Sequence, residues 1–394
     1  MLDFGSTRVV VLLASVLKPV DDTRMRGKFA RTLLERPNFQ VHVAGRGTGD
    51  DLDPELVKAF SRVCQHRIFW GSRLSLNRLT AQWRYWRLLQ VLQPQLVVVH
   101  APELLPLTLL WQCLRSGRKF LYDIRENYAL NVSTQGVYRG VVQRGLAAGL
   151  RWIEGVAARR ACAVVLAEQS YADELPFLAA LPTGRVLVLE NKYQPALPAA
   201  LPNRPYALPK PVEPLRLLYS GTISELNGVW EAIALAEQLR TAWPGGVHLT
   251  VIGFCQQPGL LGRLQAKVVA HADWLTLEGG AALVPHAAIV AAIARSHVGL
   301  LPYRPHPSTA RCRPTKLFEY LAHGLPVLCP PNPLWVKLLE QHRAGLAVDF
   351  AASVDAAALA NALQSEAFYP SGLPNDVLWA AEGKKLWRLL DSVV

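Results

Sequence analysis

The stretch Arg311-Cys-Arg-Pro-Thr-Lys-Leu-Phe-Glu-Tyr-Leu-Ala-His-Gly-Leu-Pro-Val-Leu328 predicts a short helix that leads into a buried strand. Pro314 is favourable in the first turn of a helix, and Gly324 is favourable just after its end. Lys316 and Glu319 are three residues apart, so they share one face of this helix. That face is either a ligand site or an ordinary solvated ion pair. The Leu and Val residues around it favour the ligand site.

A lysine near a helix N-terminus is electrostatically unfavourable unless an anion lies beside it, because the backbone N–H groups there already carry positive charge. Lys316 occupies that position, and Arg311 and Arg313 add two more cations just before it. A bound diphosphate would resolve this conflict. Glu319, one turn further along, could then accept hydrogen bonds from ribose hydroxyls. The helix therefore predicts a site for a nucleoside diphosphate.

A second candidate site lies upstream, in Leu217-Leu-Tyr-Ser-Gly-Thr-Ile-Ser-Glu-Leu-Asn-Gly-Val-Trp-Glu-Ala-Ile233. We expect a strand to end at Ser220, Gly221 to permit a tight turn, and a helix to begin near Asn227. Such a turn presents backbone N–H groups and the positive end of a helix to an anion. A purely structural turn would explain the same glycine equally well.

Apolar strand-like runs alternate with amphipathic helices along the whole chain, which is typical of parallel α/β layers. Prolines at positions 195, 198, 202, 205, 209, 211 and 214 predict a semi-rigid linker over residues 196–214. We therefore expect two doubly wound, Rossmann-like domains, residues 1–195 and 208–372, that face each other across a cleft. The expected strands are Arg8–Ala14, Gln40–Ala44, Leu96–His100, Phe120–Asp123, Ala163–Leu166, Arg185–Leu189, Leu215–Ser220, His248–Gly253, Leu275–Glu278, Val298–Pro302, Pro326–Cys329 and Leu346–Val348.

Composition and charge narrow the class of protein. The 394 residues are 51% hydrophobic and 18% charged, which indicates a globular chain, and no apolar run is long enough to span a membrane. The cysteines form no Cys-x-x-Cys pair, so the sequence does not indicate a zinc or redox site. No signal peptide is recognisable, so we expect a cytoplasmic protein. Residues 1–205 hold 27 Lys and Arg against 16 Asp and Glu, whereas residues 206–394 hold 15 against 14. This asymmetry points to an anionic partner for the first half. Without a recognition motif, nucleic acid is disfavoured.

Two arginine-rich helices in the first half, expected at 74–92 and 137–160, offer two readings. They are either core-packing helices with solvated arginines, or interfacial helices anchored by Trp83, Trp86 and Trp152 on an anionic membrane. The second reading makes the protein peripheral on the inner face of a membrane.

Both quoted stretches resemble segments of the family 4 glycosyltransferases, which have the GT-B architecture. Tyr122-Asp-Ile-Arg-Glu-Asn-Tyr128 is similar to the family's acceptor-side Y-D-x-H-E element, and Val99-His-Ala-Pro-Glu-Leu104 to its H-x-H-D/E strand end. Lys18-Pro-Val-Asp-Asp-Thr-Arg24 resembles the family's first strand-to-helix loop. The resemblance implies transfer of a sugar, with retention, from a nucleoside-diphosphate sugar to a glycan or lipid-linked acceptor. It implies neither a metal nor another cofactor, and a final helix, Val377–Ser392, that crosses back to the first domain.

The resemblance also assigns residues. Lys316 would bind the diphosphate and Glu319 the ribose. The expected donor-binding residues are Ser220, Gly221, Thr222, Asn227, Arg311, Arg313, Lys316 and Glu319. The expected catalytic residues are His100, Glu103, Asp123 and Glu126, with Asp22, Arg24 and Arg125 as further acceptor-side candidates.

Several positions depart from the family pattern. Arg311 stands where the family often has Glu, and Thr222 and Asn227 stand where it often has Arg and Lys. Two alternatives therefore remain open: a nucleotide-sugar epimerase of the same fold, and a catalytically silent protein that binds a sugar nucleotide or a glycan.

Overall fold

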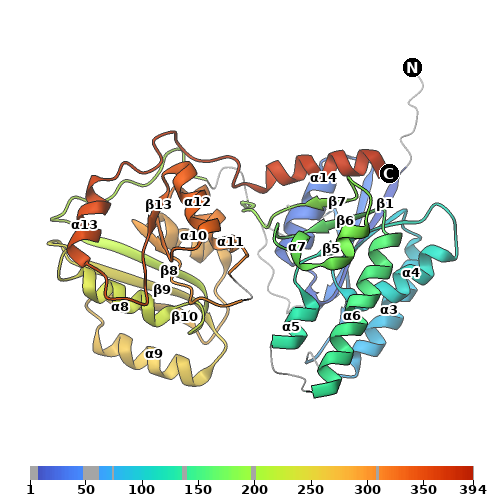
Figure 1. The fold of residues 1–394 in the computed structure, drawn as a ribbon, viewed down its shortest axis with the longest axis horizontal. Coiled ribbons are helices and arrows are strands. Elements are labelled where there is room, and N and C mark those ends of the chain that lie inside the picture. Colours follow the sequence, from blue (N-terminus) through green and yellow to red (C-terminus); the bar gives the residue numbers. More distant parts are fainter. Residues whose placement is uncertain are drawn as a thin grey trace. The chain divides into compact units, whose positions relative to one another are not determined.

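The computed structural model describes residues 8–47, 62–72, 75–134, 140–196, 201–307 and 310–393, and it divides the chain into two compact units (Figure 1). Unit 1 comprises Met1–Ala196 and Trp379–Val394, and unit 2 comprises Leu197–Leu378. Each unit is built on a parallel β-sheet with helices on both faces. Within the described ranges, no helix is both long enough and apolar enough to cross a membrane.

The sheet of unit 1 has seven described strands in the order β3-β2-β1-β4-β5-β6-β7. The order reverses between β1 and β4, and ligands of doubly wound sheets bind at the carboxyl ends of the strands at such a switch point. Strand β3 was not expected, because Cys64–Arg67 in its centre are polar or exposed and break the apolar run. The strands are β1 Val9–Pro19, β2 Phe39–Arg46, β3 Val63–Phe69, β4 Leu96–Val99, β5 Lys119–Ile124, β6 Ala163–Leu166 and β7 Val186–Val188.

Two helical layers cover this sheet. On one face, η1 and α14 pack on Val11 and Leu13, and the Trp379 indole donates a hydrogen bond to Thr32 Oγ1 at 3.0 Å. On the other face, α3, α4 and α6 lie side by side (Figure 1). The first helix after β1, η1, is a π-helix. The helices are η1 Thr23–Ala30, α1 Arg31–Leu33, α3 Asn77–Leu92, η2 Pro102–Leu104, α4 Leu105–Cys113, α5 Tyr128–Thr134, α6 Gly140–Arg160, α7 Tyr171–Glu174, η3 Pro176–Ala180 and α14 Trp379–Val393.

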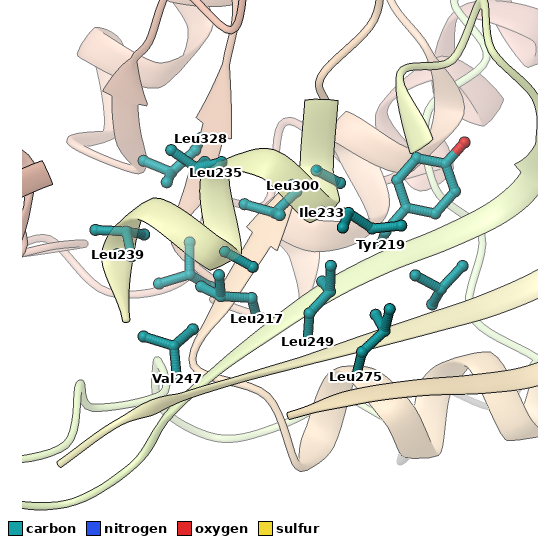
Figure 2. Close-up of a cluster of buried hydrophobic side chains, with 14 of the residues drawn as sticks. Leu217, Tyr219, Ile233, Leu235, Leu239, Val247, Leu249, Leu275, Leu300 and Leu328 are labelled. Atoms are coloured by element: carbon teal, nitrogen blue, oxygen red, sulfur yellow. The ribbon is translucent and has the colours of Figure 1, made fainter. Parts of the chain in front are cut away.

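Unit 2 repeats this architecture with six described strands in the order β10-β9-β8-β11-β12-β13, and its switch point lies between β8 and β11. Leu217, Leu249 and Leu300 of the sheet pack against Ile233, Leu235 and Leu239 of α8 (Figure 2). The elements are β8 Leu215–Ile223, α8 Val229–Leu239, β9 Val247–Cys255, α9 Pro258–Ala270, β10 Leu275–Gly280, α10 His286–Ala294, β11 Val298–Leu300, α11 Thr315–Ala322, β12 Val327–Cys329, α12 Pro333–His342, β13 Gly345–Ala347 and α13 Ala356–Ser365.

The proline-rich segment has no helix or strand over residues 201–214, in keeping with its prolines. It is attached to unit 2 rather than free. The Tyr206 N–H donates to the Gly324 carbonyl at 3.2 Å, and Leu208 packs on the core of unit 2. The Glu213 carbonyl accepts a hydrogen bond from the Trp243 indole at 2.8 Å.

Candidate functional site

The carboxyl-terminal part of β8 forms the first part of the candidate site. Gly221 has a φ of +92°, a conformation that other residues adopt only with strain. The side chain of Lys316, the second residue of α11, lies over Gly221, where a Cβ atom would stand 2.5 Å from Lys316 Cε and 2.9 Å from Nζ. The glycine therefore leaves room for the lysine at the switch point of unit 2.

Lys316 is enclosed by aromatic rings instead of carboxylates. Its Nζ lies 5.3 Å from the ring centroid of Tyr219, on β8, and 5.4 Å from that of Tyr303, which follows β11. Both distances suit cation–π attraction. In the described part of the chain no ion pair joins Lys316 to Glu319, so the alternative of an ordinary i,i+3 pair is wrong. The lysine charge thus remains beside the N-terminus of α11.

Glu319 pairs with a residue that the sequence did not single out. Its Oε1 lies 2.6 Å from Nε2 of His286, the first residue of α10. The Glu319 side chain is 9% exposed and that of His286 is 51% exposed. The hydrogen bond that His286 donates to Glu319 raises the pKa of His286, and partial burial opposes this shift. A lone histidine at a helix start carries no signal in the sequence, so only the fold could reveal this pair.

The other expected donor-side residues divide into three sets. Ser220 is buried and its hydroxyl bonds to that of Tyr320 at 2.8 Å, which ties β8 to α11. Thr222 lies near the end of β8, and its carbonyl accepts a hydrogen bond at 2.9 Å from Nδ2 of Asn227, in the β8–α8 loop. Arg311 and Arg313 lie in the loop that leads into α11.

In unit 1, the expected residues His100, Asp123 and Arg24 form one fully buried cluster at the carboxyl ends of β4 and β5. Asp123 accepts two hydrogen bonds from the Arg24 guanidinium, at 2.6 and 2.8 Å, and a third from His100 Nδ1 at 2.7 Å. Arg24 also donates to the Leu189 carbonyl at 3.0 Å and to Asn191 Oδ1 at 3.2 Å. Asp123 therefore holds His100 in place from within the core.

The charges in this cluster set the proton positions. Burial alone would raise the pKa of Asp123, but the charge and hydrogen bonds of Arg24 outweigh burial and hold that pKa below its ordinary value. Burial lowers the pKa of His100, so the imidazole is neutral near pH 7. An ionised carboxylate can only accept, so His100 Nδ1 carries the proton. His100 Nε2 is then a bare acceptor, buried without a hydrogen-bond partner among the residues that the structure describes.

The remaining acceptor-side residues form ion pairs around this cluster. Arg125 binds both carboxylate oxygens of Asp22, at 2.8 and 3.0 Å. Asp22 also caps η1 by accepting from the N–H groups of Arg24 and Met25. Glu126 accepts from Lys18 Nζ at 2.8 Å, while Glu103 pairs with Arg78 at 3.1 Å, on the side of α3.

A cavity of about 480 Å³ lies between α5 and α6. Its walls are largely apolar, and Arg151 and Glu174 supply charge. Asn127, one residue after Glu126, bridges these two charged residues. Its Oδ1 accepts a hydrogen bond from Arg151 at 2.7 Å, and its Nδ2 donates one to Glu174 at 3.0 Å. No signal in the sequence pointed to this cavity, because its two helices meet only in the folded unit.

Comparison with known proteins places the fold. No protein-family model and no curated protein matches the sequence. Among solved structures, sucrose-phosphate synthase from Thermosynechococcus elongatus has a TM-score of 0.65 and 14% identity, covering 98% of this chain and 99% of its own. Anabaena HepE, in complex with UDP and glucose, has a TM-score of 0.63 and 13% identity, covering 98% and 100%.

The UDP-GlcNAc 2-epimerase from Neisseria meningitidis, bound to UDP-GlcNAc, has a TM-score of 0.58 and 12% identity, covering 98% and 100%. Such identities establish the fold alone. With the two doubly wound sheets described above, they confirm the expectation of two Rossmann-like domains: this chain has the GT-B fold.

Proposed function

We propose that this protein is a family 4-like glycosyltransferase, which moves a hexose-type sugar from a nucleoside-diphosphate sugar to a glycan or lipid-linked acceptor. The observation that carries the proposal is Lys316, which lies over Gly221 at the switch point of unit 2 without a carboxylate partner in the described residues. Glu319 lies one turn away on the same helix. HepE and the epimerase, which have the same fold, were solved with UDP and with UDP-GlcNAc.

On the donor side, Lys316 and the N-terminus of α11 would bind the diphosphate and stabilise the negative charge that grows as the sugar departs. Glu319 would accept hydrogen bonds from ribose hydroxyls. The positive charge comes from the protein itself, so we propose that transfer needs no metal. Retention at the anomeric carbon follows from the resemblance to the family.

On the acceptor side, the bare Nε2 of His100 suits a sugar hydroxyl, which can donate the hydrogen bond that this nitrogen lacks in the described structure. Glu126 lies two residues after β5 and next in the chain to Asn127, which lines the α5–α6 cavity, and that cavity is our candidate for acceptor binding. An acceptor on a lipid carrier would place the enzyme on the inner face of an anionic membrane, in the synthesis of a polysaccharide.

The test of the donor site is calorimetry with UDP, GDP and ADP on the purified protein. A charge-assisted hydrogen bond contributes about 1.5–3 kcal/mol, so Lys316→Ala should weaken binding about 10–150-fold. Lys337→Ala, which removes an exposed lysine from α12 of the same unit, is the matched control. Equal affinities of the two variants would contradict the assigned role.

The test of the reaction is incubation of nucleotide sugars with and without glycan or lipid acceptors. Transfer to an acceptor supports the proposal. Donor conversion without any acceptor would favour an epimerase, and tight donor binding without turnover would favour a catalytically silent binding protein.

A further inference from the structure

We propose that the outer surface of the α3–α4–α6 layer in unit 1 docks onto an anionic lipid bilayer. We call this surface the arginine face, and its marker residues are Leu79, Trp83, Arg87, Leu110, Trp152 and Arg160. The inference extends the membrane contact of the proposed function, but it rests only on the surface of unit 1 and needs no catalytic residue. The three helices lie side by side on one face of the sheet, so their exposed side chains belong to one layer (Figure 1).

Helix α3 carries an apolar stripe that its core contacts do not explain. Its buried stripe is Ala81, Tyr85 and Leu89. On the opposite side of the same helix, Leu79 and Trp83 are 70% and 61% exposed. A helix that only packs on a sheet needs one apolar stripe, and its other face is normally polar.

The neighbouring helices extend this exposed apolar surface. Leu110 on α4 is half-exposed, and Trp152 on α6 is 69% exposed. Val141 and Val142 are exposed on the first turn of α6. Large apolar side chains gathered on one layer mark an interaction surface, whereas single exposed leucines would not.

The charges on the arginine face select the partner. Helices α3, α4 and α6 contain seven arginines and one carboxylate, Glu154, which is fully buried and bonded to the Tyr122 hydroxyl at 2.7 Å. These three helices therefore present positive charge and no exposed carboxylate. Arg87 lies 5.7 Å from the ring centroid of Trp83, so cation and aromatic ring are adjacent.

Arginines interleaved with exposed Trp, Leu and Val match a bilayer interface better than the other anionic partners. Lipid phosphates would attract the arginines, the indoles would lie at the headgroup level, and the aliphatic side chains would reach the acyl chains. Nucleic acid would satisfy the arginines but leave the aliphatic side chains in water. The combination of charge and exposed apolar surface therefore favours anionic lipid.

The test is co-sedimentation of the full-length protein with vesicles that are either purely phosphatidylcholine or contain one quarter phosphatidylglycerol, in 50 and 500 mM salt. We expect binding to the anionic vesicles alone, and loss of binding in high salt because surface attraction is screened. Arg87→Glu/Arg160→Glu should weaken that binding about 25-fold or more. Lys210→Glu/Lys337→Glu, with the same change of net charge on exposed positions of unit 2, should bind like the wild type.

A second pair of variants separates lipid insertion from charge alone. Leu79→Ser/Trp83→Ser keeps every charge and should also weaken vesicle binding, and brominated acyl chains should quench its tryptophan fluorescence less than that of the wild type. UDP or GDP binding should be the same in the unit 1 variants as in the wild type, because the proposed donor site lies in unit 2. Failure of the proposed function would instead appear in the Lys316→Ala measurements.

The proposal is overturned if the wild type stays in the supernatant with anionic vesicles in 50 mM salt. It is also overturned if both charge-reversal variants lose binding equally, since net charge would then be the cause. Binding to an RNA or DNA heteropolymer without binding to vesicles would assign the arginine face to nucleic acid instead.

Discussion

Lys316 crosses the backbone of Gly221 so closely that a Cβ atom at position 221 would stand 2.5 Å from the lysine Cε. The two residues come from different elements, β8 and α11. Because Gly221 has no side chain, the Lys316 ammonium group can lie over the strand. This contact places a cation over the strand end at the switch point of unit 2, where doubly wound sheets bind their ligands.

Gly221→Ala should therefore damage both the fold and the donor site. Alanine at a φ of +92° is strained and would displace Lys316, so we expect a loss of about 1–3 kcal/mol in unfolding free energy together with weaker nucleotide binding. Gly262→Ala in α9 is the control, since no atom lies within 4 Å of the added methyl group. Denaturant titration and calorimetry on both variants check this. A tolerated Gly221→Ala with unchanged affinity would show that the contact has no such role.

The pair His286–Glu319 should stabilise unit 2 in acid more than in base. The pKa of His286 is raised by Glu319, so the pair's contribution is full below the ordinary histidine pKa and is lost as the pH rises through the raised value. His286→Gln should lower stability more at pH 5.5 than at pH 8.5. With His286 half-exposed, solvent screening limits the difference to at most about 1 kcal/mol. A pH-independent effect of the substitution would contradict this.

His100 should have the opposite effect in unit 1. Burial depresses its pKa, so below about pH 6.5 the unfolded chain takes up a proton that the folded chain does not. Stability should then fall with acidification by up to about 1.4 kcal/mol per pH unit. His100→Asn should flatten the dependence between pH 5 and pH 6.5, measured by denaturant titration at each pH. An unchanged slope would mean that His100 is protonated in the folded state.

Asp123 should be essential to the folding of unit 1. Asp123→Asn would leave the buried guanidinium of Arg24 without its counter-charge, and breaking a buried pair costs about 3–5 kcal/mol. Asp273→Asn breaks the exposed pair with Arg240 and should cost less than about 1 kcal/mol. Comparable losses of unfolding free energy in the two variants would refute the structural role of Asp123.

Sugar transfer, once an acceptor is found, should persist in the presence of a chelator. The donor half has no Asp-x-Asp element, and Lys316 with the N-terminus of α11 offers positive charge for the leaving diphosphate. The measurement is transfer rate with EDTA and with added magnesium or manganese. Activity that EDTA abolishes and either metal restores would count against a metal-independent mechanism.

The sequence by itself determined the layers of the fold. Apolar strand runs and proline or glycine punctuation are local properties, so twelve of the thirteen described strands match expected runs, among them β8, β11 and β12 around the candidate donor site. The helix of Lys316 and Glu319 could be predicted for the same reason, since their spacing and the flanking Pro314 and Gly324 lie within one short segment. Strand β3 was missed because its polar centre lacks such a pattern.

Only the tertiary structure decided which side chains meet. Glu319 contacts His286, 33 positions away, and Asp123 contacts Arg24, 99 positions away. Such pairs depend on strand order and on the packing of helices from distant segments, which no local pattern encodes. The same holds for Lys316, whose position over Gly221 requires β8 and α11 to come together at one switch point. The local sequence thus identified the candidate charged residues, and the tertiary structure determined which residues they contact.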